Sequence, residues 1–103
     1  GAVTQATSKS TGVTLNQPCG QITMHDAALA AGAEVTFTVT DSFVAAGHVV
    51  LVNHGSAGTA GAYLVQANTI AAGSFKVTVS NASAGSLGEA IVLNFAIIKA
   101  AAA

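Results

Sequence analysis

The feature of the sequence that most constrains the fold is a strict alternation of apolar and polar residues in two short segments. Residues 34–40 read Glu-Val-Thr-Phe-Thr-Val-Thr, and residues 74–80 read Ser-Phe-Lys-Val-Thr-Val-Ser. Successive side chains of an extended chain point to opposite faces, so each segment puts Val and Phe on one side and hydroxyl or charged groups on the other. This period of two predicts half-buried antiparallel strands with a Thr-rich solvent face.

Further segments have the length and composition of strands, at residues 12–16, 20–24, 49–53, 62–67 and 90–98. The last of them is apolar on both faces. A strand of this kind is central in its sheet or has its outer face covered by a neighbour. One predicted face carries Ile91, Leu93, Phe95 and Ile97, and the other carries Val92, Asn94, Ala96 and Ile98.

Turns rich in Gly, Asn and Ser separate these segments at short intervals. This rhythm predicts an all-β fold, an antiparallel β-sandwich of jelly-roll or immunoglobulin-like type with about eight short strands. At most one helical turn is expected, in the Ala-rich residues 25–33. The 103 residues fit a single domain. We expect an extended N-terminal arm over residues 1–10, the sandwich over 11–99 and a flexible tail over 100–103.

The composition excludes several classes of partner. Charged residues make up 7% of the chain, with three Lys, no Arg and a net charge of −1, so few groups could neutralise phosphates and no nucleic-acid binding is expected. Hydrophobic residues reach 51%. Yet no apolar run approaches the ~20 residues of a membrane-spanning helix, so no membrane insertion is expected. The apolar excess indicates a surface that is covered by copies of the chain or by a partner.

No group of residues has the spacing of a metal site. His48 and His54 would share a face of one strand but lie about 20 Å apart, too far for one metal ion. The residue types of a blue-copper site occur at Cys19, Met24 and His25, but in the wrong order and at the wrong end of the chain. No metal and no cofactor are therefore expected.

No arrangement predicts catalysis either. His25 and Asp26 are adjacent, so on an extended chain they point to opposite faces, and no Gly-x-Ser-x-Gly nucleophile motif occurs. The Gly-rich residues 55–61 lack the Lys-Ser/Thr of a phosphate loop and precede a strand. We therefore expect a protein that is not an enzyme and has no catalytic residues.

Three segments carry a resemblance to a known class of protein. Residues 2–16, residues 20–24 together with 27–31, and residues 89–99 resemble small β-rich virion proteins of tailed bacteriophages, namely capsid decoration (cement) and head-fibre proteins. The resemblance implies a structural virion protein that is made in the host cytoplasm and decorates and stabilises the capsid exterior. It also implies a homotrimer whose partner is the major capsid protein of the phage.

Two regions are the expected contacts with the capsid or between subunits. An extended arm can add a strand to an exposed sheet edge, which points to Val3, Thr4 and Gln5. Trimerisation would cover the outer face of the last strand, at Val92, Asn94 and Ile98. Two alternatives stay open. One is a phage fibre module that recognises the host cell surface through the loops at 55–61 and 81–88, and the other is an immunoglobulin-like cell-surface adhesion module.

Overall fold

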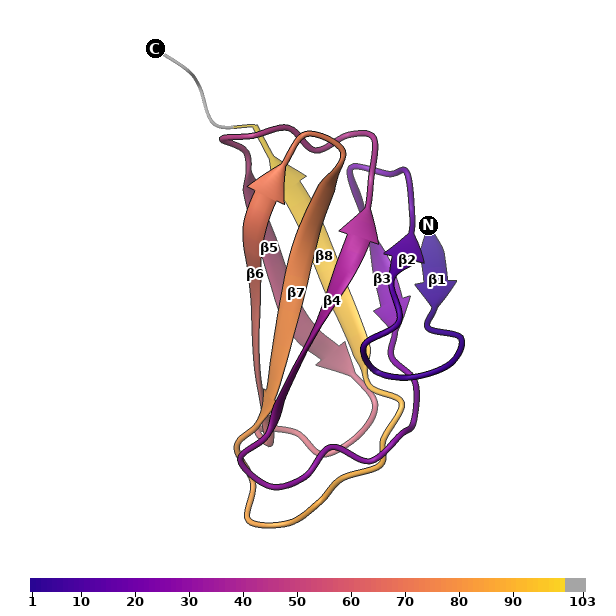
Figure 1. Cartoon of the computed structure of the whole chain (residues 1–103), viewed down its shortest axis with the longest axis vertical. Coiled ribbons are helices and arrows are strands. Elements are labelled where there is room, and N and C mark those ends of the chain that lie inside the picture. The colour runs from indigo at the N-terminus through magenta and orange to yellow at the C-terminus, as the bar shows by residue number, and fades with distance from the viewer. Residues whose placement is uncertain (100–103) are drawn as a thin grey trace.

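The computed structural model describes residues 1–99 and contains two four-stranded sheets, with no helix among these residues (Figure 1). The prediction of an all-β fold with eight strands is confirmed. Sheet A has the order β1-β3-β8-β5, and sheet B has the order β2-β4-β7-β6. The strands are β1 (Ala2–Thr4), β2 (Val13–Thr14), β3 (Cys19–Thr23), β4 (Glu34–Thr40), β5 (Val49–Ser56), β6 (Tyr63–Ala71), β7 (Ser74–Asn81) and β8 (Val92–Ile98).

The core lies between the two sheets and is built from the apolar sides of the alternating strands. Phe37 of β4 and Phe75 of β7 are 2% and 0% exposed, and Leu93 of β8 is fully buried on the opposite sheet. The rings of Phe75 and Phe95 meet across the core with centroids 5.6 Å apart. Each such side chain contributes about 1.5–3 kcal/mol through burial. The predicted inward faces of residues 34–40, 74–80 and 90–98 are confirmed.

The sheets are mixed, which corrects the expectation of a purely antiparallel sandwich. β1 pairs in parallel with β3, and β2 pairs in parallel with β4, whereas the other pairings are antiparallel. The chain runs along the edge of sheet A as β1 and then along the edge of sheet B as β2. Parallel strands need a long crossover, and each connection here supplies one by passing through the other sheet: residues 5–18 join β1 to β3 through β2, and residues 15–33 join β2 to β4 through β3.

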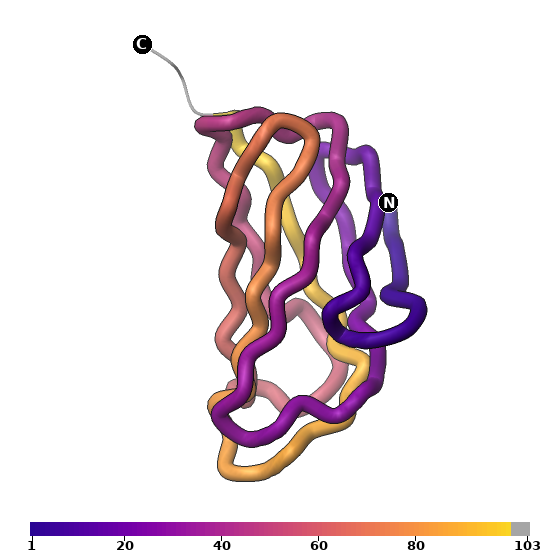
Figure 2. Tube along the Cα trace, viewed as in Figure 1, coloured from indigo at the N-terminus to yellow at the C-terminus, as the bar shows by residue number. Residues whose placement is uncertain are grey.

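Residues 1–10, the expected extended N-terminal arm, lie against the sandwich, and their strand β1 pairs with β3. Figure 2 shows this segment lying along one edge of the two sheets. The Gln5 amide is buried, donates to the carbonyls of Lys9 (2.8 Å) and Thr11 (3.1 Å), and accepts from the backbone N–H of His25 (2.9 Å). The ammonium of Lys9 is buried as well and donates to the carbonyls of His25 and Glu89. Polar side chains in this segment therefore satisfy backbone groups inside the fold.

The remaining expectations about chain organisation concern two short segments. Residues 25–33 form no helical turn, and Leu29 instead makes an antiparallel bridge to Leu87. The expected tail at 100–103 lies outside the described residues.

Candidate functional site

The outer faces of the two sheets differ in chemistry. The outer face of sheet B is polar, with Thr36, Thr38 and Thr40 on β4 beside Lys76 and Thr78 on β7. Hydroxyl groups bond to one another there, as between Thr36 and Thr78 (2.9 Å). The outer face of sheet A carries no charged side chain in the described part of the chain. A face without charge resembles the centre of a protein interface more than ordinary protein surface.

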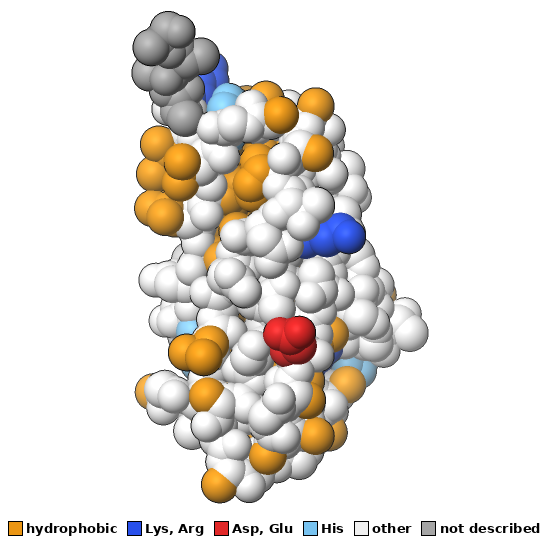
Figure 3. Space-filling model, turned by 60° about the vertical axis from the view of Figure 1, so that its left-hand side comes forward, with side chains coloured by type: hydrophobic (Ala, Val, Ile, Leu, Met, Phe, Trp, Pro, Cys, Tyr) orange, Lys and Arg blue, Asp and Glu red, His pale blue; other side chains and the backbone are white. Residues whose placement is uncertain are grey.

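We call this outer surface of sheet A the A face. Apolar side chains stand out from it into solvent, with Leu51 at 56% exposure and Val49 and Ile98 at 46% each. Figure 3 turns the side of the molecule with β5 and β6 forward, and on this side hydrophobic side chains gather near the end where β8 finishes, while charged side chains stand singly. The A face consists of Cys19, Gln21 and Thr23 of β3, Val49, Leu51 and Asn53 of β5, and Val92, Asn94, Ala96 and Ile98 of β8, with Ala2 and Thr4 of β1 at its edge.

The strand register arranges these side chains in rows that cross the strands. Two apolar rows lie at the end where β8 finishes, followed by a row of amides and then by a row with two hydroxyl groups. The chemistry of the A face therefore changes in one direction along the strands. The apolar rows are Val49–Ile98 and Leu51–Ala96–Cys19, the amide row is Asn53–Asn94–Gln21, and the hydroxyl row is Val92–Thr23–Thr4.

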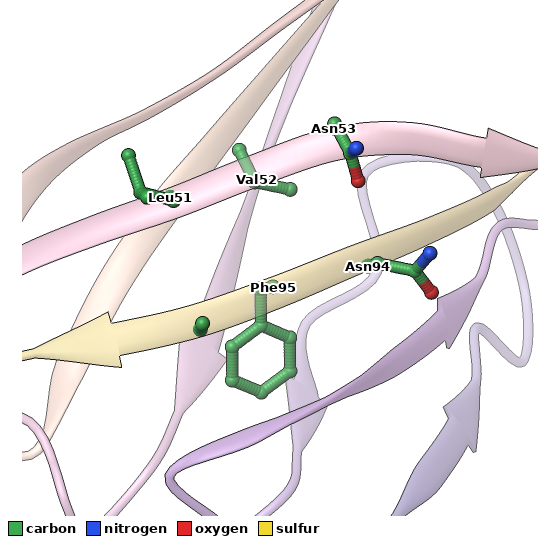
Figure 4. A pocket seen from close by; sticks show the side chains of 6 residues that line it. Leu51, Val52, Asn53, Asn94 and Phe95 are labelled. Carbon is green, nitrogen blue, oxygen red and sulfur yellow. The ribbon is translucent and has the colours of Figure 1, made fainter.

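A shallow depression of about 420 Å³ lies where the apolar and amide rows meet, lined among others by Leu51, Asn53, Asn94 and Ala96. Figure 4 shows the amides of Asn53 and Asn94 next to each other on neighbouring strands. Gly55 makes room for the second amide, because a Cβ at Gly55 would lie 2.2 Å from Nδ2 of Asn94. The depression thus combines apolar surface with two groups that both donate and accept hydrogen bonds.

The structure brings four of the six predicted contact residues to the A face. Val92, Asn94 and Ile98 share one side of β8, and Thr4 lies at the edge of the same face. The other two do not belong to it: Val3 packs against the core, and the Gln5 side chain is buried.

Sequence reasoning missed the contribution of β3 and β5 to this face. Residues 49–53 were recognisable as a strand with two apolar faces. In the structure β8 lies between β3 and β5. This order depends on pairing between segments that are far apart in the chain, which the sequence pattern does not reveal.

A second cluster of polar groups lies at the opposite end of the sandwich from the apolar rows. The carboxylate of Glu89 accepts from the backbone N–H of Thr59 (2.9 Å), from the Thr59 hydroxyl (2.9 Å) and from the Tyr63 hydroxyl (2.7 Å). The His54 ring stands edge-on to Tyr63, with centroids 5.4 Å apart. These bonds tie the loop at 57–61 to the segment before β8.

The ionisation of this cluster fits a structural role. The hydrogen bond from the Thr59 backbone, followed by that from Tyr63, lowers the pKa of Glu89 below its ordinary value. Burial, reinforced by the hydrogen bond to Glu89, raises the pKa of Tyr63 to about 12. A carboxylate that is held ionised by several donors is a weak base, so Glu89 is suited to anchoring the loop.

The histidines and the cysteine considered for metal binding lie apart. His48 accepts a hydrogen bond from the backbone of Ala45 (3.1 Å) and His25 accepts one from Ala27 (3.0 Å), each within its own turn. Cys19 is an exposed free thiol on the A face. Within residues 1–99 no three His, Cys, Asp or Glu side chains are grouped as metal ligands.

None of the described residues form a helix with the length and hydropathy needed to cross a membrane. Comparisons with protein-family models, with curated proteins and with solved structures find no match to this chain. The A face and the loops at the opposite end of the sandwich from its apolar rows are therefore the features that bear on function.

Proposed function

We propose that the protein is a structural component of a tailed-bacteriophage virion, a homotrimer that decorates and stabilises the capsid exterior and catalyses no reaction. The observation that carries the proposal is the A face, an uncharged sheet surface with Leu51, Val49 and Ile98 open to solvent. Contiguous apolar surface on a folded domain marks a site of association. The resemblance of residues 2–16, 20–24 with 27–31, and 89–99 to decoration and head-fibre proteins supports the virion setting.

The proposed action is thermodynamic. A protein that binds the assembled shell but not free capsid subunits stabilises the shell by mass action. Three linked copies on a symmetric lattice of the major capsid protein gain avidity without any new kind of contact. The protein is made in the host cytoplasm and acts at the virion surface.

Within this proposal the sandwich is of jelly-roll type in preference to immunoglobulin-like. The order β3-β8-β5 in one sheet over β4-β7-β6 in the other supports this choice. The chain changes sheet from β3 to β4, from β4 to β5, from β5 to β6 and from β7 to β8.

One observation favours a second candidate, a fibre module that recognises the host cell surface. The loops at 55–61 and 81–88 lie at the same end of the sandwich, together with residues 25–33 (Figure 1). Asn81 ties two of these segments together by donating to the carbonyls of Leu29 (2.8 Å) and Gly85 (2.9 Å). Such a rigid loop end would suit recognition by shape. A cell-surface adhesion module is the third candidate and predicts a monomer.

The test measures where the purified protein is retained and in what state. The protein is incubated with host cells in one sample and, in another, with phage capsids that lack it. Both samples are then sedimented, and the native mass of the protein is measured in parallel. Retention on capsids and a trimeric mass agree with the proposal. Retention on cells alone favours the fibre module, and a monomer retained by neither contradicts both.

A further inference from the structure

The rows of the A face restrict how two copies of this chain could meet. We propose that copies associate through their A faces in parallel, around a symmetry axis that runs along β8, so that each row meets the same row of its neighbour. This inference deepens the proposed function by assigning its self-association surface and symmetry. It rests on the proposed function, but it can fail while capsid binding holds, because the capsid could bind elsewhere on the protein.

A second copy is the partner that best fits a face without charge. Side chains that lie on or beside a symmetry axis meet their own copies, so an axis along a charged strand brings like charges together. The outer face of sheet B would do so with Glu34 and Lys76, whereas the rows of the A face contain no charge. Lys99 follows the last apolar row and is exposed.

The direction follows from the change in chemistry along the strands. An axis that reverses the strands sets the row of Val49 and Ile98 against the row of Thr23 and Thr4, and hydroxyl groups buried against apolar surface without a partner destabilise a contact. An axis along β8 sets apolar rows on apolar rows. The amide row then meets another amide row, and each Asn or Gln has both donors and acceptors for its counterpart.

The size of the face predicts weak association in free solution. At about 3.3 Å per residue and about 4.8 Å between strands, sheet A covers roughly 350–400 Å² in projection. Two such faces fall below the ~1,200 Å² at which stable specific interfaces begin. We therefore expect an assembly that forms with rising protein concentration, strengthened where a lattice holds several copies together.

The first test compares one substitution on both sheets. Leu51 on the A face and Leu64 on the outer face of sheet B are both exposed edge-strand residues, at 56% and 66%. Sedimentation velocity is measured over a concentration series for the wild type, Leu51→Glu and Leu64→Glu. We expect the wild type and Leu64→Glu to assemble alike, and Leu51→Glu to stay monomeric with an unchanged unfolding midpoint.

A wild type that stays monomeric, or a Leu51→Glu variant that assembles like the wild type, overturns the inference. Sedimentation with bare capsids separates this failure from a failure of the proposed capsid binding. If the wild type is monomeric and binds capsids, and the Leu51→Glu variant does not bind them, then the A face contacts the capsid and not a second copy.

The second test determines direction by cross-linking. In a Cys19→Ser background, Val92→Cys and Ile98→Cys are made separately and treated with a short bismaleimide, alone and mixed. The parallel arrangement predicts that each variant cross-links to itself. A reversed arrangement places the two positions against each other and separates each from its own copy by about 20 Å, so it would give mixed products only.

Discussion

Asn94 of β8 stands directly opposite Asn53 of β5, and the two amides lie side by side on an uncharged sheet surface (Figure 4). Gln21 of β3 continues the row on the other side of Asn94. Three strands that are distant in sequence thus place their amides at one level, between apolar side chains and hydroxyl groups. This row is the part of the A face that gives it a direction.

Replacing Gly55 should disturb Asn94 more than it disturbs the fold. A Cβ at this position would meet the Asn94 amide at 2.2 Å, and the flexible side chain can move away. We expect Gly55→Ala to lower the free energy of unfolding by less than about 1 kcal/mol and to weaken self-association. A double-mutant cycle with Asn94→Ala checks the cause, since the effect of Gly55→Ala on association should vanish in that background.

The Gln5 side chain should contribute strongly to stability because its amide is buried and makes hydrogen bonds to three backbone groups. At about 1 kcal/mol for each bond, Gln5→Ala should lower the free energy of unfolding by about 3 kcal/mol, measured by urea denaturation. Gln66→Ala on sheet B is the matched control, because Gln66 is exposed and its loss should matter little. Equal effects of the two substitutions would contradict the burial of the N-terminal segment.

Glu89 should make the protein less stable in acid. Its folded pKa lies below the ordinary value of 4.5, so the stabilisation is complete above pH 4.5 and is lost as the pH falls through the folded pKa. The difference in unfolding free energy between wild type and Glu89→Gln should therefore shrink on acidification from pH 6 towards pH 3. A difference that stays constant with pH would rule out the ionised carboxylate as the loop anchor.

Tyr63 should act at the alkaline end. Its pKa is raised from 10.0 to about 12 in the folded protein, so its stabilisation is present below pH 10 and is lost as the pH rises towards 12. Tyr63→Phe removes the hydroxyl and should lower stability by about 1 kcal/mol at neutral pH. The difference in unfolding free energy between wild type and Tyr63→Phe should disappear between pH 10 and pH 12. It is measured by urea denaturation monitored by circular dichroism.

The local structure of this chain was predictable where the alternation is strict, as at Phe37 and Val39 in β4. The two faces of β8 were also predictable, because alternation assigns Leu93 and Asn94 to opposite sides. Alternation carries no information on which strands pair, so the positions of β3 and β5 beside β8 were not predictable. The burial of Gln5 was not predictable for a related reason: its Ser- and Thr-rich segment is typical of an extended arm, and the backbone partners of the amide come together only in the fold.

The reactivity of Cys19 tests the central claim most directly. This thiol is the only one in the chain and is exposed on the A face of a single copy. Its rate of reaction with a maleimide is measured as the protein concentration rises and again after bare capsids are added, with the unassembled Leu51→Glu variant as reference. If the A face is covered on assembly, the rate falls several-fold while that of the variant stays constant. A rate that is the same at every concentration and on capsids would contradict the account.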